Sequence, residues 1–401
     1  MNHPAAPSAP LSGSRRHWLR LAGAGALAPW ASLVLAGQAD AQAPRFVFVN
    51  LRGGMDGLFA VPAIGDPAFA SARGRLAQYP AAPLALQGPF ALHPALSQLH
   101  GLYRAGELAV VHAVGTPYRE RSHFDGQQVL EGGGTLPYQY KDGWLGRALL
   151  AAGGKGVALQ TAVPLVLRGT REVDTWAPSV LPDPPADLLQ RMAGLYQDDA
   201  TLAAALQRAR ALREGQAEEA MAGGRRGSLV PLATKAAAFL AQPRGPQVAV
   251  LEMSGWDSHA NQGLPTGPLA DNLRHLDEGL AALRQGLSGP AAGDVWRRTV
   301  VVVATEFGRA VEPNGNHGTD HGNGSAAFVL GGAVQGGRVL ADWPGLAKAQ
   351  RLEGRDLMPT TDLRSVLKGV LGDHLRIRQQ ALDTVVFPGT SGLKAVSLLR
   401  A

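Results

Sequence analysis

The 401-residue sequence predicts an α/β fold, a three-layer sandwich in which helices cover both faces of a mainly parallel central sheet. Short, continuous apolar runs recur along the chain, as expected of strands that are buried on both faces of a sheet. Segments with the helical period lie between several of these runs, and this alternation favours parallel strand pairing. The composition, 45% hydrophobic and 17% charged, is that of an ordinary globular protein.

The expected strands and helices alternate through most of the chain. In chain order the strands are 45–51, 108–114, 162–167, 247–253, 299–304 and 326–330, and the helices are 94–104, 123–131, 144–152 and 271–287. The last helix is the clearest, because its leucines recur at spacings of three and four and so share one face: Leu273, Leu276, Leu280, Leu283 and Leu287.

Residues 183–243 have a different composition, rich in Ala, Leu, Arg and Glu. We expect them to form a helical insertion into a single α/β domain that covers residues 44–401. A pair of ordinary crossover helices is the alternative interpretation of the same segment.

The N-terminus predicts export. Arg15 and Arg16 precede an apolar stretch rich in Ala and Gly, and the sequence Ala39-Asp40-Ala41 fits a signal-peptidase site. Residues 1–41 are therefore expected to be a twin-arginine signal peptide, with the twin-arginine translocase as a partner and a periplasmic or secreted location. A membrane anchor is the alternative, but glycines and a proline interrupt the apolar stretch, so no stable span is expected after cleavage.

Charge and cysteine content limit the chemistry. The net charge is +6, and no block of Lys and Arg with interleaved aromatics is present, so nucleic acid is not an expected partner. A mildly basic surface favours an anionic small-molecule or polymer substrate. The absence of cysteine excludes thiolate zinc sites, iron–sulfur clusters and thiol nucleophiles, so Asp, Glu, His or other oxygen donors must hold any metal.

Polar side chains follow four of the expected strands directly. They are Asp56 after the first strand, Ser122, His123 and Asp125 after the second, Asp257 and His259 after the fourth, and Glu306, His317, Asp320 and His321 after the fifth. Ligands of open parallel sheets bind at the carboxyl ends of the strands, so these side chains are expected to meet at one edge. Each of them taken alone is more typical of a turn or a helix cap than of a ligand.

Together the side chains predict a metal site. Its expected ligands are Asp56, Asp257, His259, Glu306, Asp320 and His321. Such donors suit Zn²⁺, Mn²⁺, Mg²⁺ or Ca²⁺, and one or two divalent ions are possible. Ser122, at a helix start, is the expected nucleophile. The expected surrounding residues, including two arginines that could hold an anion, are Arg119, Arg121, His123, Asp125 and His317.

Several motifs resemble a bacterial family known as domain of unknown function 1501. They are "FVNLRGGMDGL", "SHFDGQQ", "GWDSHANQ", "TEFGR", "GTDHGNGSAAFVLGGAVQGGRV" and "ADWPGL", and they extend over most of the chain after the signal. The family in turn resembles, more distantly, the alkaline phosphatase/sulfatase superfamily. That resemblance implies an α/β sandwich with a metal site at the carboxyl edge, in which Asp56, Asp257, His259 and His321 correspond to ligands and Ser122 to the nucleophile.

One departure from the superfamily pattern affects the expected function. Glu306-Phe307 stands where the superfamily usually has an Asp-His pair, which removes one implied ligand. The resemblance implies an exported, metal-dependent hydrolase of phosphate or sulfate esters. The alternative, favoured by the departure, is a non-catalytic exported binding or assembly protein that retains the fold.

Overall fold

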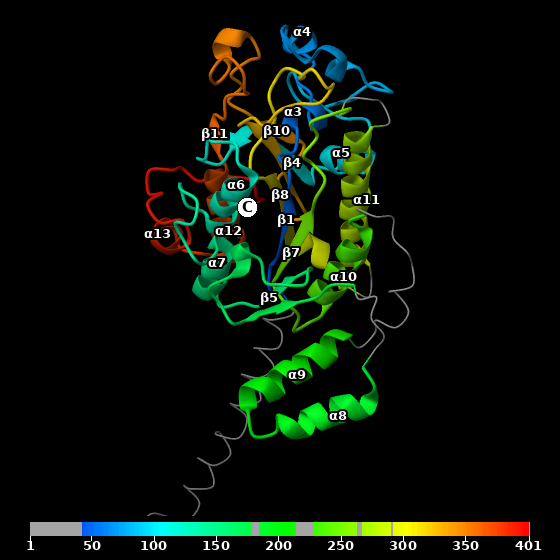
Figure 1. Ribbon diagram of the computed structural model, residues 1–401, viewed down its shortest axis with the longest axis vertical. Helices are drawn as coiled ribbons and strands as arrows, with labels where there is room; N and C mark the ends of the chain where they lie inside the picture. The colour runs from blue at the N-terminus through cyan, green and yellow to red at the C-terminus, as the bar shows by residue number, and fades with distance from the viewer. Residues whose placement is uncertain (1–41, 179–183, 214–227, 263–266, 290–291, 401) are drawn as a thin grey trace, which may run out of the picture. The chain divides into compact units, whose positions relative to one another are not determined.

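The central sheet of the computed structural model lies between two layers of helices (Figure 1). The structure describes residues 42–178, 184–213, 228–262, 267–289 and 292–400. The predicted signal peptide, residues 1–41, lies outside the described residues. Residues Pro44–Ala401 form one compact unit.

The main sheet has nine strands within the described residues, in the order β10-β4-β9-β8-β1-β7-β5-β6, with β11 beside β4. The strands are β1 (Arg45–Leu51), β4 (Leu108–Gly115), β5 (Gly156–Ala158), β6 (Val173–Thr175), β7 (Val248–Met253), β8 (Thr299–Thr305), β9 (Ser325–Leu330), β10 (Arg338–Leu340) and β11 (Thr361–Asp362). Among them, only β9 runs antiparallel to its neighbours, β4 and β8. The carboxyl ends of β1, β4, β7 and β8 therefore share one edge, and β9 begins there. A separate pair is β2 (Leu84–Ala85) with β3 (Ala91–Leu92).

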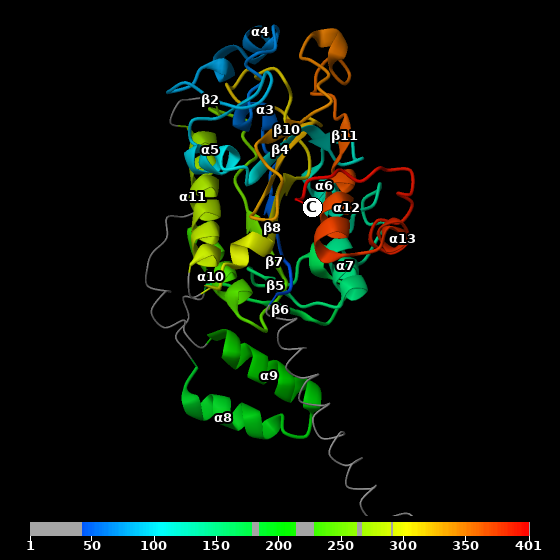
Figure 2. The same cartoon turned by 180° about the vertical axis from the view of Figure 1, so that it is seen from behind.

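Helices cover both faces of this sheet. The helices within the described residues are α3 (Gly57–Ala60), α4 (Phe69–Arg73), α5 (Ser97–Arg104), α6 (His123–Gly132), α7 (Trp144–Ala152), α8 (Ala186–Leu195), α9 (Ala200–Arg213), α10 (Val230–Ala241), α11 (Pro268–Ser288), α12 (Leu363–Leu375) and α13 (Gln379–Ala381). Short 3₁₀ turns occupy Gly74–Ala77, Leu165–Leu167, Val295–Arg298 and Lys348–Gln350, and a π turn occupies Leu382–Val386. Both views place α5, α10 and α11 on one side of the sheet and α6, α7 and α12 on the other (Figures 1 and 2).

Alternation along the strands explains the three layers. In β1, Val47, Val49 and Leu51 join the core under α5, α10 and α11, whereas Phe46 and Phe48 join the core under α7 and α12. Successive side chains of a strand point to opposite faces, so a strand that is apolar throughout needs cover on both. The predicted α/β class with a mainly parallel sheet is confirmed.

One expected strand is wrong. Residues 162–167 form no strand; Leu165–Leu167 make a buried 3₁₀ turn beside α7, and the sheet is continued instead by β5. The run is apolar because Leu165, Val166 and Leu167 are buried, which a strand and a buried turn share. Pro164 precedes the turn and has no N–H to donate to a strand ladder.

The segment 183–243 contains two kinds of helix. No residue of α8 is buried, and α9 is joined to β6 by an ion pair between Arg208 and Asp174 at 3.3 Å. By contrast, α10 buries Ala233, Ala236 and Leu240 in the core that it shares with α11. The last helix of the segment is thus part of the covering layer.

No helix in the described ranges is long and apolar enough to cross a membrane.

Buried histidines predict a loss of stability in mild acid. Burial lowers the pKa of His93, His112 and His374 to about 4 each. His112 is fixed in its neutral form, because Nε2 donates to the Val61 carbonyl at 2.8 Å while Nδ1 accepts from the Ala113 N–H at 2.7 Å. A folded-state pKa below the unfolded value means that the unfolded chain binds more protons, so stability is complete above pH 6.5 and falls as the pH decreases.

We expect each of these histidines to lower the free energy of unfolding by about 2 kcal/mol between pH 7 and pH 5. Urea unfolding at a series of pH values measures the fall, and the imidazole NMR signal of His112 should not titrate above pH 5. Constant stability from pH 7 to pH 5, or a His112 pKa near 6.5, would contradict the prediction. Carboxylates of ordinary pKa contribute little in this window, so the fall reports on histidine.

Candidate metal centre

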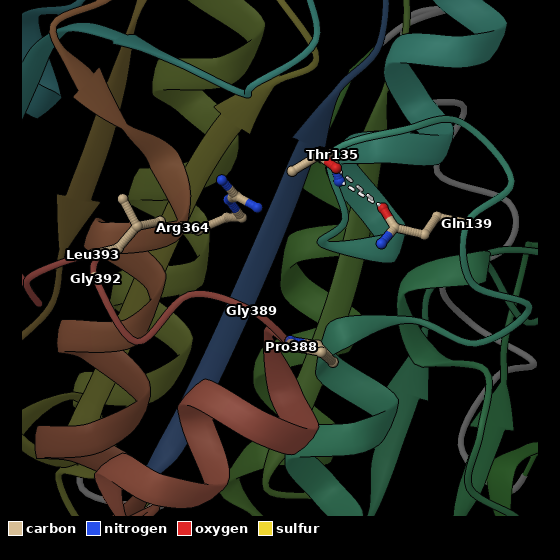
Figure 3. Close-up of a pocket in the computed structure, with 7 residues that line it drawn as sticks. All are labelled: Thr135, Gln139, Arg364, Pro388, Gly389, Gly392 and Leu393. Atoms are coloured by element: carbon tan, nitrogen blue, oxygen red, sulfur yellow. Dashed lines mark hydrogen bonds between the residues drawn. The ribbon is translucent and has the colours of Figure 1, made fainter.

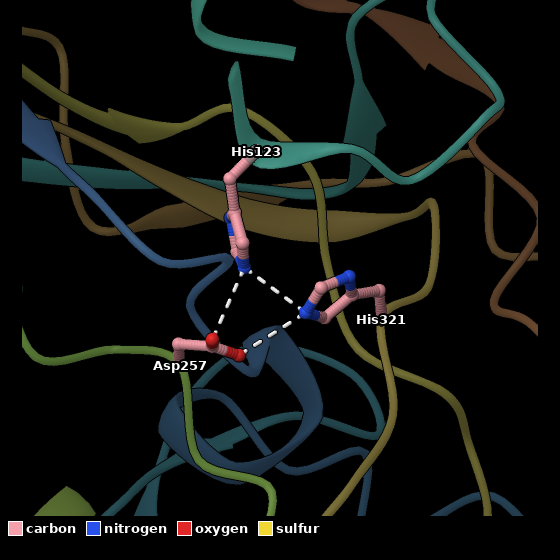
Figure 4. Close-up of side chains that lie close together, drawn as sticks. All are labelled: His123, Asp257 and His321. Atoms are coloured by element: carbon pink, nitrogen blue, oxygen red, sulfur yellow. Dashed lines mark hydrogen bonds and ion pairs between the residues drawn. The ribbon is translucent and has the colours of Figure 1, made fainter. Parts of the chain in front are cut away.

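Three imidazoles and one carboxylate converge at the carboxyl edge of the sheet. The His321 Nε2 atom lies 3.0 Å from Nε2 of both His123 and His259, and 3.1 Å from the Asp257 Oδ1 atom. His259 Nε2 is 3.0 Å from Asp257 Oδ1, and His123 Nε2 is 3.4 Å from Oδ2. We call these four residues the His–Asp cluster. Figure 4 shows three of them, His123, Asp257 and His321, whose ligand atoms all lie within 4.8 Å of one another.

The sheet topology brings the four residues together. His123 is the first residue of α6, which follows β4, and Asp257 and His259 follow β7. His321 comes shortly before β9, the strand that starts at this edge. The predicted convergence of strand ends thus produces the cluster, although His123 was expected beside the metal ligands rather than among them.

Two rings of the cluster are held by hydrogen bonds through their other nitrogen. His123 Nδ1 lies 2.7 Å from Glu306 Oε1, and His321 Nδ1 lies 2.8 Å from the Arg121 carbonyl oxygen. His259 Nδ1 lies 3.5 Å from Asp320 Oδ1, within ion-pair range. An acceptor at Nδ1 keeps the proton there and directs Nε2 to a ligand. Imidazole nitrogens and a carboxylate gathered in this way match the ligands of a divalent transition metal, so this donor set fits such an ion.

Two loops hold the cluster in place. The Thr319 N–H donates to the Ser258 carbonyl at 3.0 Å, and the Asn314 side-chain amide donates to the His259 carbonyl at 3.0 Å. Gly318 packs so closely on the His259 backbone that a Cβ atom would overlap it. Likewise, a Cβ on Gly53, at a φ of +121°, would lie 2.6 Å from the Asp257 nitrogen.

Arg309 sets the charge of Asp257. The Arg309 side chain is buried, and its Nη1 donates to Asp257 Oδ1 at 2.7 Å. Burial acts to raise the pKa of Asp257, but the hydrogen bond and charge of Arg309 outweigh it and lower the pKa to about 2. Asp257 is 42% exposed, so the cluster is open to solvent on this side. The carboxylate is therefore ionised at neutral pH.

Glu306 lies behind His123 instead of facing the cluster. Its side chain is buried, with Oε1 accepting from the Gly53 N–H at 2.9 Å and Oε2 from the Thr305 hydroxyl at 2.8 Å. Burial acts to raise the pKa of Glu306, and the hydrogen bonds from His123, Thr305 and Gly53 lower it overall. The bond to Glu306 also raises the pKa of His123. The Asp320 carboxylate likewise lies beside the Nδ1 atom of a cluster histidine, His259, but its side chain is exposed.

Asp56 lies outside the His–Asp cluster. Its Oδ2 atom is 2.5 Å from Arg73 Nη2 and also accepts from the Gln262 amide, while Oδ1 accepts from the Phe59 N–H at 3.1 Å. Both partners of this ion pair are almost completely buried. The carboxylate expected to bind a metal is thus bound to a guanidinium.

Ser122 is the N-cap residue of α6 but makes no capping hydrogen bond through its side chain. Its backbone N–H donates to the Tyr118 hydroxyl at 3.3 Å, and that hydroxyl lies 3.5 Å from Asp125 Oδ2. Ser122 therefore meets Tyr118 through its backbone, and Tyr118 lies beside Asp125 at the start of α6, next to His123.

The remaining predicted residues bind protein groups. Arg119 donates to the carbonyls of Thr116 and Tyr118, and Arg121 is paired with Asp356 at 2.8 Å and with Glu353 at 2.6 Å. The side chain of His317 is exposed, and its carbonyl accepts from the Gln262 N–H at 3.0 Å. Neither guanidinium is directed at the cluster. Arg121 instead contributes its backbone carbonyl, which contacts His321 Nδ1. The backbone of Arg121 has a φ of +63°, which is uncommon for a residue other than glycine.

Sequence reasoning missed Arg309, Arg73, Gln262 and Tyr118. Arg309 lies in the quoted motif "TEFGR", where its position after Glu306 could have suggested an ion pair. Arg73 lies in α4, seventeen residues after Asp56, and no local pattern indicates their contact.

A cavity of about 450 Å³ lies elsewhere (Figure 3), and none of its lining residues belongs to the cluster. Arg364 faces it from one side and Thr135 and Gln139 from the other. Since Arg364 is paired with Asp362 at 2.7 Å, this cavity offers no free cation to an anion.

The Glu306→Gln substitution should weaken metal binding. A neutral amide keeps the shape of the side chain but no longer increases the basicity of His123, and losing such a partner typically costs 10–100-fold in affinity. We expect the apparent Kd for Zn²⁺, measured by competition with a chromophoric chelator, to rise by roughly that factor. The matched control is Glu252→Gln, since Glu252 pairs with Arg52 at 2.8 Å and touches no histidine of the cluster. Equal effects of the two substitutions would contradict the assigned role.

Solved structures align with most of this chain at low identity. Lipoteichoic acid synthase LtaP from Listeria monocytogenes matches with a TM-score of 0.41 and 12% identity, over 88% of this chain and 76% of that chain. The phosphonate monoester hydrolase of Agrobacterium radiobacter matches with 0.41 and 10%, over 84% and 74%. The PsFucS1 sulfatase from Pseudoalteromonas sp. matches with 0.37 and 13%, over 77% and 66%.

No match was found among curated proteins. The profile of the family described as "Protein of unknown function (DUF1501)" matches residues 109–386, as the sequence motifs predicted, and the chain belongs to that family.

Proposed function

We propose that this protein is an exported, metal-dependent hydrolase of phosphate or sulfate esters. The observation that carries the proposal is the convergence of three Nε2 atoms and Asp257, with the rings of His123 and His321 held by acceptors at Nδ1. Metal-binding histidines in proteins have this arrangement, in which the outer acceptor fixes the tautomer and orients the ring.

The donor set favours a transition metal. Imidazole nitrogen suits Zn²⁺ and other transition metals, whereas Mg²⁺ and Ca²⁺ prefer oxygen donors. His123, His259, His321 and Asp257 would hold the ion, and Glu306, Asp320 and the Arg121 carbonyl would orient the rings. When bound, such an ion polarises an ester oxygen and stabilises developing negative charge.

The exposure of the His–Asp cluster to solvent supports a role in binding a substrate. Asp257 and His259 are 42% and 47% exposed, so a ligand can approach from that side. A structural metal site is usually closed, with all positions filled by protein, and a catalytic one keeps a position open. The exposure therefore favours a site that receives a ligand.

Ser122 is the proposed nucleophile. It starts α6, and the N-terminus of a helix stabilises negative charge such as that of an alkoxide. Ser122 lies beside Tyr118, whose hydroxyl accepts from the Ser122 backbone N–H and lies 3.5 Å from Asp125 Oδ2. The assignment rests on the position of Ser122 at the N-cap of the helix that carries His123.

The alternative function is metal-dependent binding without catalysis. The engagement of Asp56 by Arg73 favours it, because one carboxylate that the superfamily resemblance assigns to metal is bound by protein instead. The two functions share the ion and differ in turnover.

Metal-loaded protein should hydrolyse an aryl phosphate or an aryl sulfate. Ser122→Ala should lower kcat by about 10²-fold or more while leaving metal content unchanged, because it removes the attacking group alone. Asp257→Asn should lower both metal content and kcat, and circular dichroism controls for folding. Full activity of Ser122→Ala would exclude the serine as nucleophile. Bound metal without turnover of either ester would favour the binding function.

Export is tested through the signal sequence. Changing Arg15 and Arg16 together to Lys should retain the precursor in the cytoplasm, because the translocase reads the arginine pair. Cell fractionation followed by N-terminal sequencing of the exported form measures the outcome, with a mature N-terminus expected near Gln42. Normal periplasmic amounts of the double variant would overturn this part of the proposal.

A further inference from the structure

We infer that the protein binds one metal ion and that the guanidinium of Arg73 takes the place of a second cation at Asp56. The inference rests on the proposed metal site and specifies how many ions it takes. It begins from the two carboxylates that end neighbouring strands outside the His–Asp cluster, Asp56 after β1 and Glu306 after β8.

The Asp56 carboxylate is already saturated by protein donors. Oδ2 accepts from Arg73 and Gln262, and Oδ1 accepts from the Phe59 N–H. The side chain is 1% exposed. A metal ion would have to displace these N–H donors and reach an oxygen that solvent does not reach.

Arg73 is fixed as a permanent cation. Its side chain is 0% exposed, and its Nη1 donates to the Val311 carbonyl at 2.9 Å and the Ala310 carbonyl at 3.3 Å. A guanidinium does not lose its proton in proteins, so the positive charge beside Asp56 is constant over the physiological pH range. The backbone carbonyls orient this charge toward Asp56.

Glu306 offers no solvent-accessible oxygen in compensation, because its side chain is 0% exposed. Oε1 accepts from His123 and from the Gly53 N–H, and Oε2 accepts from the Thr305 hydroxyl. The carboxylates that follow β1 and β8 are therefore both engaged by groups of the chain.

A single hydrogen-bond network joins Arg73 to the His–Asp cluster. Gln262 donates to Asp56 through its nitrogen and accepts from the Thr319 hydroxyl through its oxygen. Thr319 in turn accepts from Arg309, whose Nη1 binds Asp257. Each of the two aspartates thus has its own buried arginine, and only Asp257 also faces histidine nitrogens.

Metal stoichiometry tests the inference. Protein incubated with Zn²⁺ and passed through a desalting column should retain 1 equivalent by elemental analysis, and Asp257→Asn should retain much less. Two equivalents in the wild type, or a full equivalent left in Asp257→Asn, would overturn the inference and leave the proposed metal dependence standing. No retained metal would overturn the proposed function as well.

Removing Arg73 tests its role directly. Arg73→Ala leaves the buried carboxylate of Asp56 without its partner, so we expect a lower Tm. We also expect this Tm to rise with added Zn²⁺ and the variant to bind a second equivalent of metal. The double variant Asp56→Asn with Arg73→Ala should lose the second equivalent. Arg147→Ala is the control, because it removes a largely buried arginine paired with Asp142 at 2.7 Å away from the cluster, and its Tm should not respond beyond the wild-type shift. If Arg73→Ala folds but shows neither the second equivalent of metal nor the added Tm response, the role of Arg73 is overturned. If this variant does not fold, the wild-type stoichiometry still decides the number of ions.

Discussion

The buried carboxylate of Glu306 is the interaction on which the edge of the sheet depends. It is attached to the end of β8 and binds the backbone of Gly53, which follows β1, and the ring of His123, which starts α6. Three segments distant in sequence are therefore held by one side chain. A buried carboxylate without partners would be costly, so its hydrogen bonds make the positions of Gly53 and His123 mutually dependent.

The sequence predicts the centre of the sheet because physical chemistry leaves little choice there. β1, β4, β7, β8 and β9 are mostly apolar and buried along almost their whole length, and burial between two helical layers satisfies such strands. The short strands β6, β10 and β11 are half-buried and carry no comparable pattern. The segment 162–167 shows the limit of the argument, because burial alone does not distinguish a strand from the 3₁₀ turn at Leu165–Leu167.

The site was predictable as a place and less so in its roles. Strand order brings Asp257, His259 and His321 to one edge, as their positions after apolar runs indicate. Whether a carboxylate faces a metal, the far nitrogen of a histidine or an arginine depends on contacts that no local spacing encodes. Glu306 pairs with His123, and Asp56 pairs with Arg73, a residue of α4 that belongs to none of the motifs in the sequence. The acidic residues were recognisable, and their partners were not.

Charge connects these contacts to function. Arg73 and Arg309 neutralise Asp56 and Asp257, while Glu306 and Asp320 add two further carboxylates beside the rings of His123 and His259. Under the proposed function, a divalent ion among these groups would offset their negative charge and favour the approach of an anionic ester. Two ions against the same arginines would leave a much larger positive charge at the edge of an apolar core, where uncompensated charge is costly. Under the further inference, Arg73 excludes a second ion at Asp56, whereas Arg309 keeps Asp257 ionised beside the first.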